Sequence, residues 1–237
     1  MTETTMKVLL IDDHPLILTA LQTVIQGLGS HVSVTGVPGA RAAREALAAD
    51  PGIDLVMLDL RLGDADGFAL LAELRAGYPA TPVVVVSASD RSEDVVRAID
   101  LGAMGFVPKR ASNDVLFEAL RVVMSGGIYV PKLTMGSVDP QFDPALAAPT
   151  SGAAPPASAL AAYKLTPRQT DVLGLLLRGQ SNKLIARELN LSVETVKDHV
   201  AAVLRALNVN SRTQAVIAVS RMPSQGAIAP WPSRPSP

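Results

Sequence analysis

Short apolar runs that end in polar residues constrain the fold of the first half of this chain more than any other feature. KVLLIDDHP contains Asp12 and Asp13, LVMLDL contains Asp59, VVVVSAS contains Ser87, and GFVPK ends at Lys109. Runs rich in β-branched apolar residues are typical of strands that are buried on both faces of a parallel sheet. Ligands of such sheets bind beyond the carboxyl ends of the strands, so these five side chains are predicted to share one site.

Helical patterns alternate with these runs up to about residue 125. The expected strands are 7–11, 32–35, 54–59, 83–87 and 104–107, and the expected helices are 15–28, 40–49, 68–75, 93–101 and 114–124. Five strand–helix units with short connections predict a doubly wound, flavodoxin-like α/β domain with a five-stranded parallel sheet. The right-handed crossover rule leaves 2-1-3-4-5 as the leading strand order.

A segment rich in Pro, Ala and Ser separates this domain from a wholly helical pattern. We interpret residues 1–130 as the α/β domain, 131–163 as a linker, 164–222 as a helical domain and 223–237 as a disordered tail. Thr166, followed by proline, and Ser192 mark helix starts. Four short helices, with the tight turn ELNLS between the second and third, predict an all-α helix-turn-helix domain.

Charge is unevenly distributed between the two halves, although the formal net charge is only −1. Residues 1–130 contain 10 Lys and Arg against 16 Asp and Glu, whereas residues 164–222 contain 9 against 4. This asymmetry suggests two domains with different partners. Aromatic residues make up 3% of the chain, so few side chains are available on which the bases of a single strand could stack. Duplex DNA is therefore the favoured nucleic acid. The absence of cysteine, of a membrane-length apolar stretch and of a signal peptide favours a cytoplasmic protein with no membrane partner.

The predicted site combines carboxylates, a hydroxyl and an ammonium group. Clustered carboxylates repel one another, so they must bind a cation or stay partly protonated, and oxygen ligands favour Mg²⁺. A carboxylate can attack a phosphoryl donor, while Lys109 balances charge on the phosphoryl oxygens and Ser87 offers a hydrogen bond. Alone, Asp12 or Asp13 is more often a helix N-cap, and Asp59 is equally a loop acid. Lys109 alone is most often a surface lysine, and Ser87 alone is most often a turn residue. Their convergence at one sheet edge favours a site that accepts a phosphoryl group.

The set Asp12, Asp13, Asp59, Ser87 and Lys109, with Phe106 before the lysine, resembles the receiver domain of two-component response regulators over about residues 6–125. DDHPL and GAMGFVPK resemble the NarL/FixJ subgroup. The resemblance implies that Asp59 accepts phosphate from a sensor histidine kinase. It also implies that Mg²⁺ is held by Asp12, Asp13, Asp59 and the backbone carbonyl of Arg61, that Ser87 and Phe106 form a switch pair, and that Lys109 contacts the phosphate. His14 is expected to be structural or a solvent-facing neighbour of the site.

The helix expected over 192–207 carries the candidate DNA contacts. Its stripe Val196, Val200 and Val203 must face inward, which leaves Lys197 and its polar neighbours for solvent or DNA. Lys197 can reach a guanine edge or a phosphate. The full set of predicted DNA-binding residues is Lys183, Thr195, Lys197, His199 and Arg205, of which His199 is equally a half-buried packing residue.

Residues 165–219 resemble the LuxR-type DNA-binding domain, whose diagnostic stretch here reads SVETVKDHVAAVLRAL followed by NSRTQA. Two residues depart from the family pattern. Gln169 stands where an acid is usual, and Leu184 replaces a common glutamate. Both lie outside the recognition helix, so they bear on local packing and ion pairs more than on DNA binding.

Together these patterns predict a phosphorylation-controlled, DNA-binding transcriptional regulator rather than an enzyme, apart from its own aspartyl phosphorylation and dephosphorylation. Phosphorylation is expected to promote a homodimer and operator binding, with dimerisation contributing more than unmasking. One alternative keeps DNA binding but makes the receiver a dimerisation module independent of phosphorylation, which the intact pocket disfavours. The other is a phosphatase or phosphotransferase that uses Asp59. Arg61 stands where a haloacid-dehalogenase-type site needs a second acid, and no P-loop is present.

Overall fold

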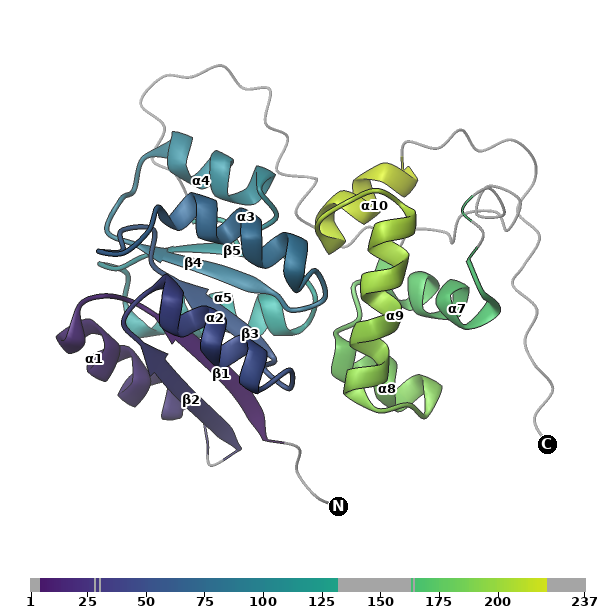
Figure 1. Cartoon of the computed structure of the whole chain (residues 1–237), viewed down its shortest axis with the longest axis horizontal. Coiled ribbons are helices and arrows are strands. Elements are labelled where there is room, and N and C mark those ends of the chain that lie inside the picture. The colour runs from purple at the N-terminus through teal and green to yellow at the C-terminus, as the bar shows by residue number, and fades with distance from the viewer. Residues whose placement is uncertain (1–4, 28, 30, 132–162, 164, 221–237) are drawn as a thin grey trace.

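The computed structural model describes residues 5–27, 29, 31–131, 163 and 165–220, which form an α/β domain and a helical domain (Figure 1). The strands of the α/β domain are β1 (Met6–Ile11), β2 (Val32–Val37), β3 (Leu55–Leu58), β4 (Val83–Ser87) and β5 (Gly105–Pro108). Its helices are α1 (Pro15–Gln26), α2 (Ala40–Ala49), α3 (Gly67–Gly77), α4 (Ser92–Asp100) and α5 (Asn113–Met124). The helical domain comprises α7 (Pro167–Leu177), α8 (Asn182–Leu189), α9 (Val193–Ala206) and α10 (Arg212–Ser220).

The described sheet is parallel throughout and has the order β2-β1-β3-β4-β5, which confirms the predicted strand order. In the register of β1 with β3, Val8 pairs with Leu55 and Ile11 with Leu58. Asp12 and Asp59 directly follow these paired strand ends, so the register alone places the two carboxylates next to each other.

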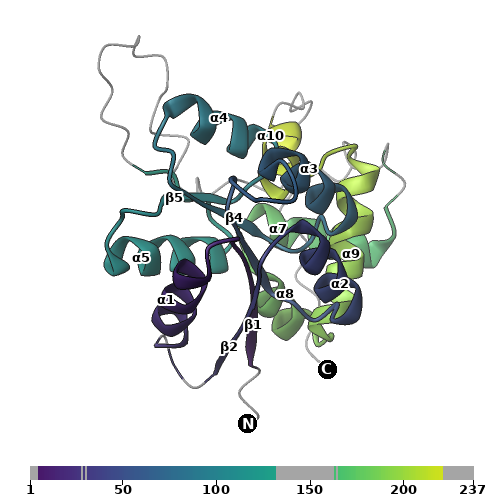
Figure 2. The same cartoon turned by 60° about the vertical axis from the view of Figure 1, so that its left-hand side comes forward.

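Helices cover both faces of the sheet (Figure 2). Leu9 and Ile11 of β1 pack in a cluster with α2, α3 and α4, whereas Val8 and Leu10 pack in a cluster with α1 and α5. Because both faces are covered, every residue of β3 and β4 is buried. This double burial explains why the apolar runs show no polar alternation.

The helical domain packs around a core of its own. Val196, Val200 and Val203 of α9 are each 0% exposed, as their spacing predicted. At the start of α7, Thr166 Oγ1 accepts a hydrogen bond from the N–H of Gln169, and Gln169 Oε1 accepts one from the N–H of Thr166 at 2.9 Å. This reciprocal capping box shows that glutamine at 169 keeps the helix start intact. Ser181 and Ser192 cap α8 and α9.

Some sequence-based bounds differ from the structure, and some concern residues outside it. Helix α1 ends at Gln26 instead of 28, and β2 continues to Val37 instead of 35. Nearly all of the predicted linker and the whole predicted tail lie outside the described residues, so both stay predictions. Among the described helices, none has the length and apolar character that crossing a membrane requires.

Candidate functional site

Four strands of the sheet bring the predicted acidic cluster and lysine to one edge. Asp12 follows β1, Asp59 follows β3, Ser87 ends β4 and Lys109 follows β5. The side chains of Asp12 and Asp59 are only 1% and 2% exposed. Carboxylates are rarely buried to this extent unless they are paired, so the chemistry of the site depends on their partner.

Lys109 is that partner. Its Nζ lies 2.6 Å from Asp12 Oδ2 and 2.7 Å from Asp59 Oδ2. The other oxygen of Asp59, Oδ1, accepts a hydrogen bond from the backbone N–H of Arg61 at 3.2 Å. Burial alone would lower the pKa of Lys109, but its hydrogen bonds to Asp12 and Asp59 and their charges outweigh burial and raise this pKa. The lysine therefore stays charged and supplies positive charge where a phosphoryl group would add negative charge.

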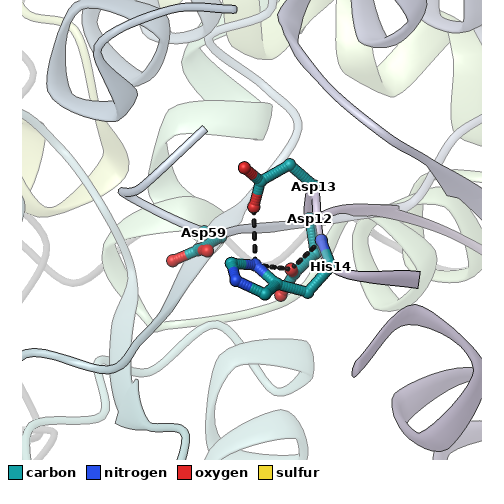
Figure 3. Close-up of side chains that lie close together, drawn as sticks. All are labelled: Asp12, Asp13, His14 and Asp59. Carbon is teal, nitrogen blue, oxygen red and sulfur yellow. Dashed lines mark hydrogen bonds and ion pairs between the residues drawn. The ribbon is translucent and has the colours of Figure 1, made fainter. Parts of the chain in front are cut away.

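A potential cation site lies beside this lysine. Asp12, Asp13, His14 and Asp59 each offer one ligand atom, and these atoms all lie within 4.8 Å of one another (Figure 3). His14 Nδ1 is 2.7 Å from Asp13 Oδ1, and the histidine side chain is 62% exposed, as expected of a solvent-facing neighbour. His14, not Asp12 or Asp13, occupies the N-cap position of α1. Three carboxylates fit a hard divalent cation such as Mg²⁺, while the role of the Arg61 carbonyl stays a prediction.

Ser87 and Phe106 are both 0% exposed, on the neighbouring strands β4 and β5. Ser87 Oγ accepts a hydrogen bond from the N–H of Ser89 at 3.1 Å, and Ser89 Oγ donates to Asp94 on α4. A hydroxyl that accepts in this way can still donate its proton to a phosphoryl oxygen. A movement of Ser87 would therefore displace Ser89 and, through its hydrogen bond to Asp94, the first turn of α4. The switch role of the pair stays a prediction.

The predicted DNA-binding residues do not all face solvent. Arg205 is exposed, and Lys183, Thr195 and His199 are half-buried. Lys197, by contrast, is only 7% exposed. The expectation that Lys197 faces solvent is therefore wrong for this structure, because a second domain packs against the outer face of α9.

The ammonium group of Lys197 is bound by the α/β domain. Its Nζ donates to the carbonyl oxygens of Pro51 and Ile53, both at 2.8 Å. These residues belong to the loop DPGID between α2 and β3, called the 50–54 loop below. Asp54 of the same loop lies 3.6 Å from Lys183 Nζ. One loop therefore engages two of the residues predicted to bind DNA, and Lys197 cannot contact DNA in this position.

Further contacts extend this interface along the amino ends of the strands, opposite the edge that carries Asp59. Asn182 Nδ2 donates to the carbonyl oxygen of Ala80, and Gln214 Nε2 donates to that of Asp100, both at 3.0 Å. The methyl group of Ala80 belongs to the apolar cluster of the helical domain. Figure 1 shows the result, with α9 lying between the α/β domain and helix α7.

Sequence reasoning missed the partners of Lys197 and one carboxylate near the acidic cluster. Pro51 and Ile53 act through backbone carbonyls, for which the residue type gives no signal. Asp64 caps α2 by accepting hydrogen bonds from its first two N–H groups. A signal for Asp64 existed, because Gly39 leaves α2 without a capping side chain of its own.

Comparisons with known proteins identify both domains. The family model described as the response regulator receiver domain matches residues 8–121, and the model described as bacterial regulatory proteins of the luxR family matches residues 163–219. The chain is 34% identical over 216 residues to the nitrate/nitrite response regulator protein NarP of Escherichia coli, which covers 90% of this chain and 94% of NarP. It is 33% identical over 214 residues to the glycerol metabolism activator of Pseudomonas putida, with 89% and 93% covered.

Solved structures show the same architecture. The response regulator RcsB of Salmonella typhimurium matches with a TM-score of 0.51 and 19% identity over 92% of this chain and all of RcsB. A complex of RcsB with DNA matches with a TM-score of 0.51 and 21% identity over 91% of this chain and 98% of RcsB. At these identities the likeness concerns the fold alone.

Proposed function

The chain belongs to the response regulators that join a receiver domain to a LuxR-type DNA-binding domain, and we propose that phosphorylation of Asp59 releases the DNA-binding domain from the receiver. Members of this family are DNA-binding transcription regulators under the control of phosphorylation, not enzymes acting on an external substrate. The observation that carries the proposed release is the burial of Lys197 against the 50–54 loop.

The phosphoacceptor chemistry follows from the contacts of Asp59. An oxygen of its carboxylate would attack the phosphorus of a phosphohistidine on a sensor kinase. The phosphorus–nitrogen bond breaks with its electron pair left on the imidazole, and an acyl phosphate forms. Mg²⁺ held by Asp12, Asp13 and Asp59 would neutralise charge on the phosphoryl oxygens. Lys109 exchanges its contact with the free carboxylate for one with the phosphoryl group, and Ser87 donates a hydrogen bond to it.

A conformational route from this site to the DNA-binding domain runs along α4. The first turn of α4 is tied to Ser87 through Ser89 and Asp94. The last residue of the helix, Asp100, accepts the hydrogen bond from Gln214 of the DNA-binding domain. A shift of α4 on phosphorylation would therefore disturb the interface that holds α9. We call the arrangement with α9 against the receiver closed and the arrangement with α9 released open. Phosphorylation would favour the open arrangement only to the extent that it stabilises that arrangement more than the closed one.

The contacts of Lys197 bear on whether dimerisation or unmasking of α9 contributes more to activation. From the sequence, dimerisation was expected to contribute more than unmasking. The hydrogen bonds of Lys197 to Pro51 and Ile53 favour the opposite order, since Lys197 must leave the receiver before it can reach a base or a phosphate. A homodimer on a two-fold DNA site remains part of the proposal as the step that follows release.

Binding to a pool of genomic duplex fragments at fixed salt tests the proposal. Wild type and Asp59→Asn are each assayed with and without beryllofluoride plus Mg²⁺, which mimics the acyl phosphate. We expect enrichment of one fragment class that strengthens only for activated wild type. Equal enrichment in all four samples would instead support a receiver that acts independently of phosphorylation, and no enrichment would refute the DNA-binding assignment of Lys197 and Arg205.

A further inference from the structure

Helix α2 begins without a capping side chain of its own. Its N-cap residue is Gly39, and the first N–H groups of any helix lack partners within the helix. Asp64 supplies the missing acceptors from the loop that follows β3. Its Oδ1 accepts from the N–H of Ala40 at 2.9 Å, and its Oδ2 accepts from the N–H of Arg41 at 3.1 Å. The carboxylate also lies at the positive end of the helix dipole. Both hydrogen bonds lower the pKa of Asp64.

The loop that Asp64 anchors is residues 59–66, called the acceptor loop below because it begins with Asp59. Its base is closed by the bridge between Arg61 and Asp66 and by the hydrogen bond from the N–H of Gly67 to the carbonyl of Leu60, at 3.2 Å. A Cβ on Gly67 would lie 2.4 Å from Leu60 Cα, so only glycine allows this closure. The base of the acceptor loop is therefore fixed, and Asp64 fixes its tip.

The tip of the acceptor loop lies beside the acidic cluster. A Cβ on Gly63 would lie 3.4 Å from Asp13 Oδ2, in ordinary contact distance. Asp13, Gly63 and Asp64 line an open hollow of about 260 Å³ at the start of α2. Between the base and the tip, the N–H of Arg61 donates to Asp59 Oδ1. Movement of the tip would therefore alter both the packing of Gly63 beside Asp13 and the hydrogen bond from Arg61 to Asp59.

We propose that Asp64 is a positioning residue of the phosphoacceptor site, which holds the acceptor loop in the conformation that binds Mg²⁺ and accepts the phosphoryl group. The inference rests on the proposed function, because it takes Asp12, Asp13 and Asp59 as the cation site. Asp64 is not among the residues of the cation site, and both of its carboxylate oxygens are engaged by N–H groups of α2. It acts through Gly63 and Arg61, whose places depend on the tether to α2.

Asp64 has a second effect that must be separated from this role, because a cap on α2 also stabilises the fold. The chain offers a way to separate them. A Cβ on Gly39 would lie 2.5 Å from Asp64 Oδ1, and the φ of Gly39 is 175°, an extended conformation open to any residue. In an Asp64→Ala background, Gly39→Ser would therefore place a hydroxyl where the carboxylate had been. The serine caps α2 locally but leaves the acceptor loop untethered.

The experiment compares full-length wild type, Asp64→Ala, Asp64→Ala with Gly39→Ser, and Asp64→Asn. Mg²⁺ affinity is measured by calorimetry, stability by thermal unfolding without Mg²⁺, and the rate of phosphorylation with a small acyl phosphate donor. Substitutions behind metal ligands typically weaken metal binding about 10-fold or more. We expect Asp64→Ala to lose about 10-fold in Mg²⁺ affinity and to unfold at lower temperature. The double variant should regain the unfolding temperature but not the Mg²⁺ affinity, and Asp64→Asn, which keeps one acceptor oxygen, should fall between wild type and Asp64→Ala.

Recovery of both properties in the double variant would show that Asp64 only caps α2, and this would overturn the positioning role. Unchanged Mg²⁺ affinity in Asp64→Ala would overturn it as well. A failure of the part of the proposed function on which this inference rests, phosphorylation of Asp59, has a different signature, since wild type itself would then neither bind Mg²⁺ nor accept phosphate. Faster amide hydrogen exchange within residues 60–66 in both Asp64→Ala variants would support the tether directly.

Discussion

Replacing Ala80 with glutamate should open the contact between the two domains and strengthen DNA binding by the unphosphorylated protein. Ala80 is 4% exposed, and it belongs to the apolar cluster of the DNA-binding domain, not to either cluster of the sheet. Glutamate there would bury an unpaired carboxylate, which costs on the order of 3 kcal/mol or more. In the open arrangement the same side chain would lie in a solvated turn, so the substitution penalises the closed arrangement only.

The contacts of α9 and its neighbours set the size of the effect. Lys197 donates two hydrogen bonds to carbonyl oxygens, and hydrogen bonds of a charged group contribute about 1.5–3 kcal/mol each. Removal of the ammonium group from water offsets most of that gain. The neutral hydrogen bonds of Asn182 and Gln214 add about 1 kcal/mol each. A net closing free energy of about 2 kcal/mol corresponds to a roughly 30-fold preference for the closed arrangement.

Apparent DNA affinity falls in proportion to the open fraction, so Ala80→Glu should bind a cognate duplex about 30-fold more tightly than unphosphorylated wild type. Fluorescence anisotropy at about 0.15 M salt measures this difference. Ala20→Glu is the matched control, because it adds the same charge at an exposed position of α1, away from α9 (Figure 1), and it should bind like wild type. Equal affinities for Ala80→Glu and wild type, with both still responding to beryllofluoride, would refute masking by the receiver.

Three further predictions follow from single contacts. Lys109→Met leaves the buried carboxylates of Asp12 and Asp59 facing each other and should lower the free energy of unfolding without Mg²⁺ by about 3 kcal/mol, measured by urea denaturation. Because the folded-state pKa of Lys109 is raised, its contribution to stability is complete below the unfolded pKa of about 10.4 and is lost as pH rises through the folded value. The difference between wild type and Lys109→Met should therefore stay constant from about pH 7 to about pH 10 and shrink only above that; a decline near neutral pH would contradict the assigned ion pairs. Thr166→Ala removes the capping box of α7 and should lower the stability of the DNA-binding domain by about 1 kcal/mol in urea unfolding followed by circular dichroism. Arg205→Ala should weaken binding to all duplexes alike and reduce the salt dependence of log affinity by about one unit, whereas a loss confined to one sequence would mark Arg205 as a base contact.

The sheet and its acidic edge were predictable because their determinants are local. Each buried strand is a continuous apolar run, and each functional residue follows or ends its own run. Once the strands are parallel and ordered by right-handed crossovers, Asp12, Asp59, Ser87 and Lys109 have one common edge to occupy. The exact contact, a lysine Nζ within 2.7 Å of Asp59 and 2.6 Å of Asp12, needed the register of β1 with β3.

The helical periodicity of α9 determined which side chains enter the core of its own domain, and Val196, Val200 and Val203 are buried as expected. Periodicity carries no information about what covers the opposite face. Only the tertiary structure decided that Lys197 would bind two carbonyl oxygens from residues 146 and 144 positions away. For Asp64 the sequence gives half of the answer, because Gly39 signals that α2 lacks a capping side chain, but only the fold shows that a residue 24 positions away supplies it. Backbone groups attract a cation or a carboxylate wherever the fold presents them, so the partner in such a pairing depends on three-dimensional placement and cannot be identified from the sequence pattern.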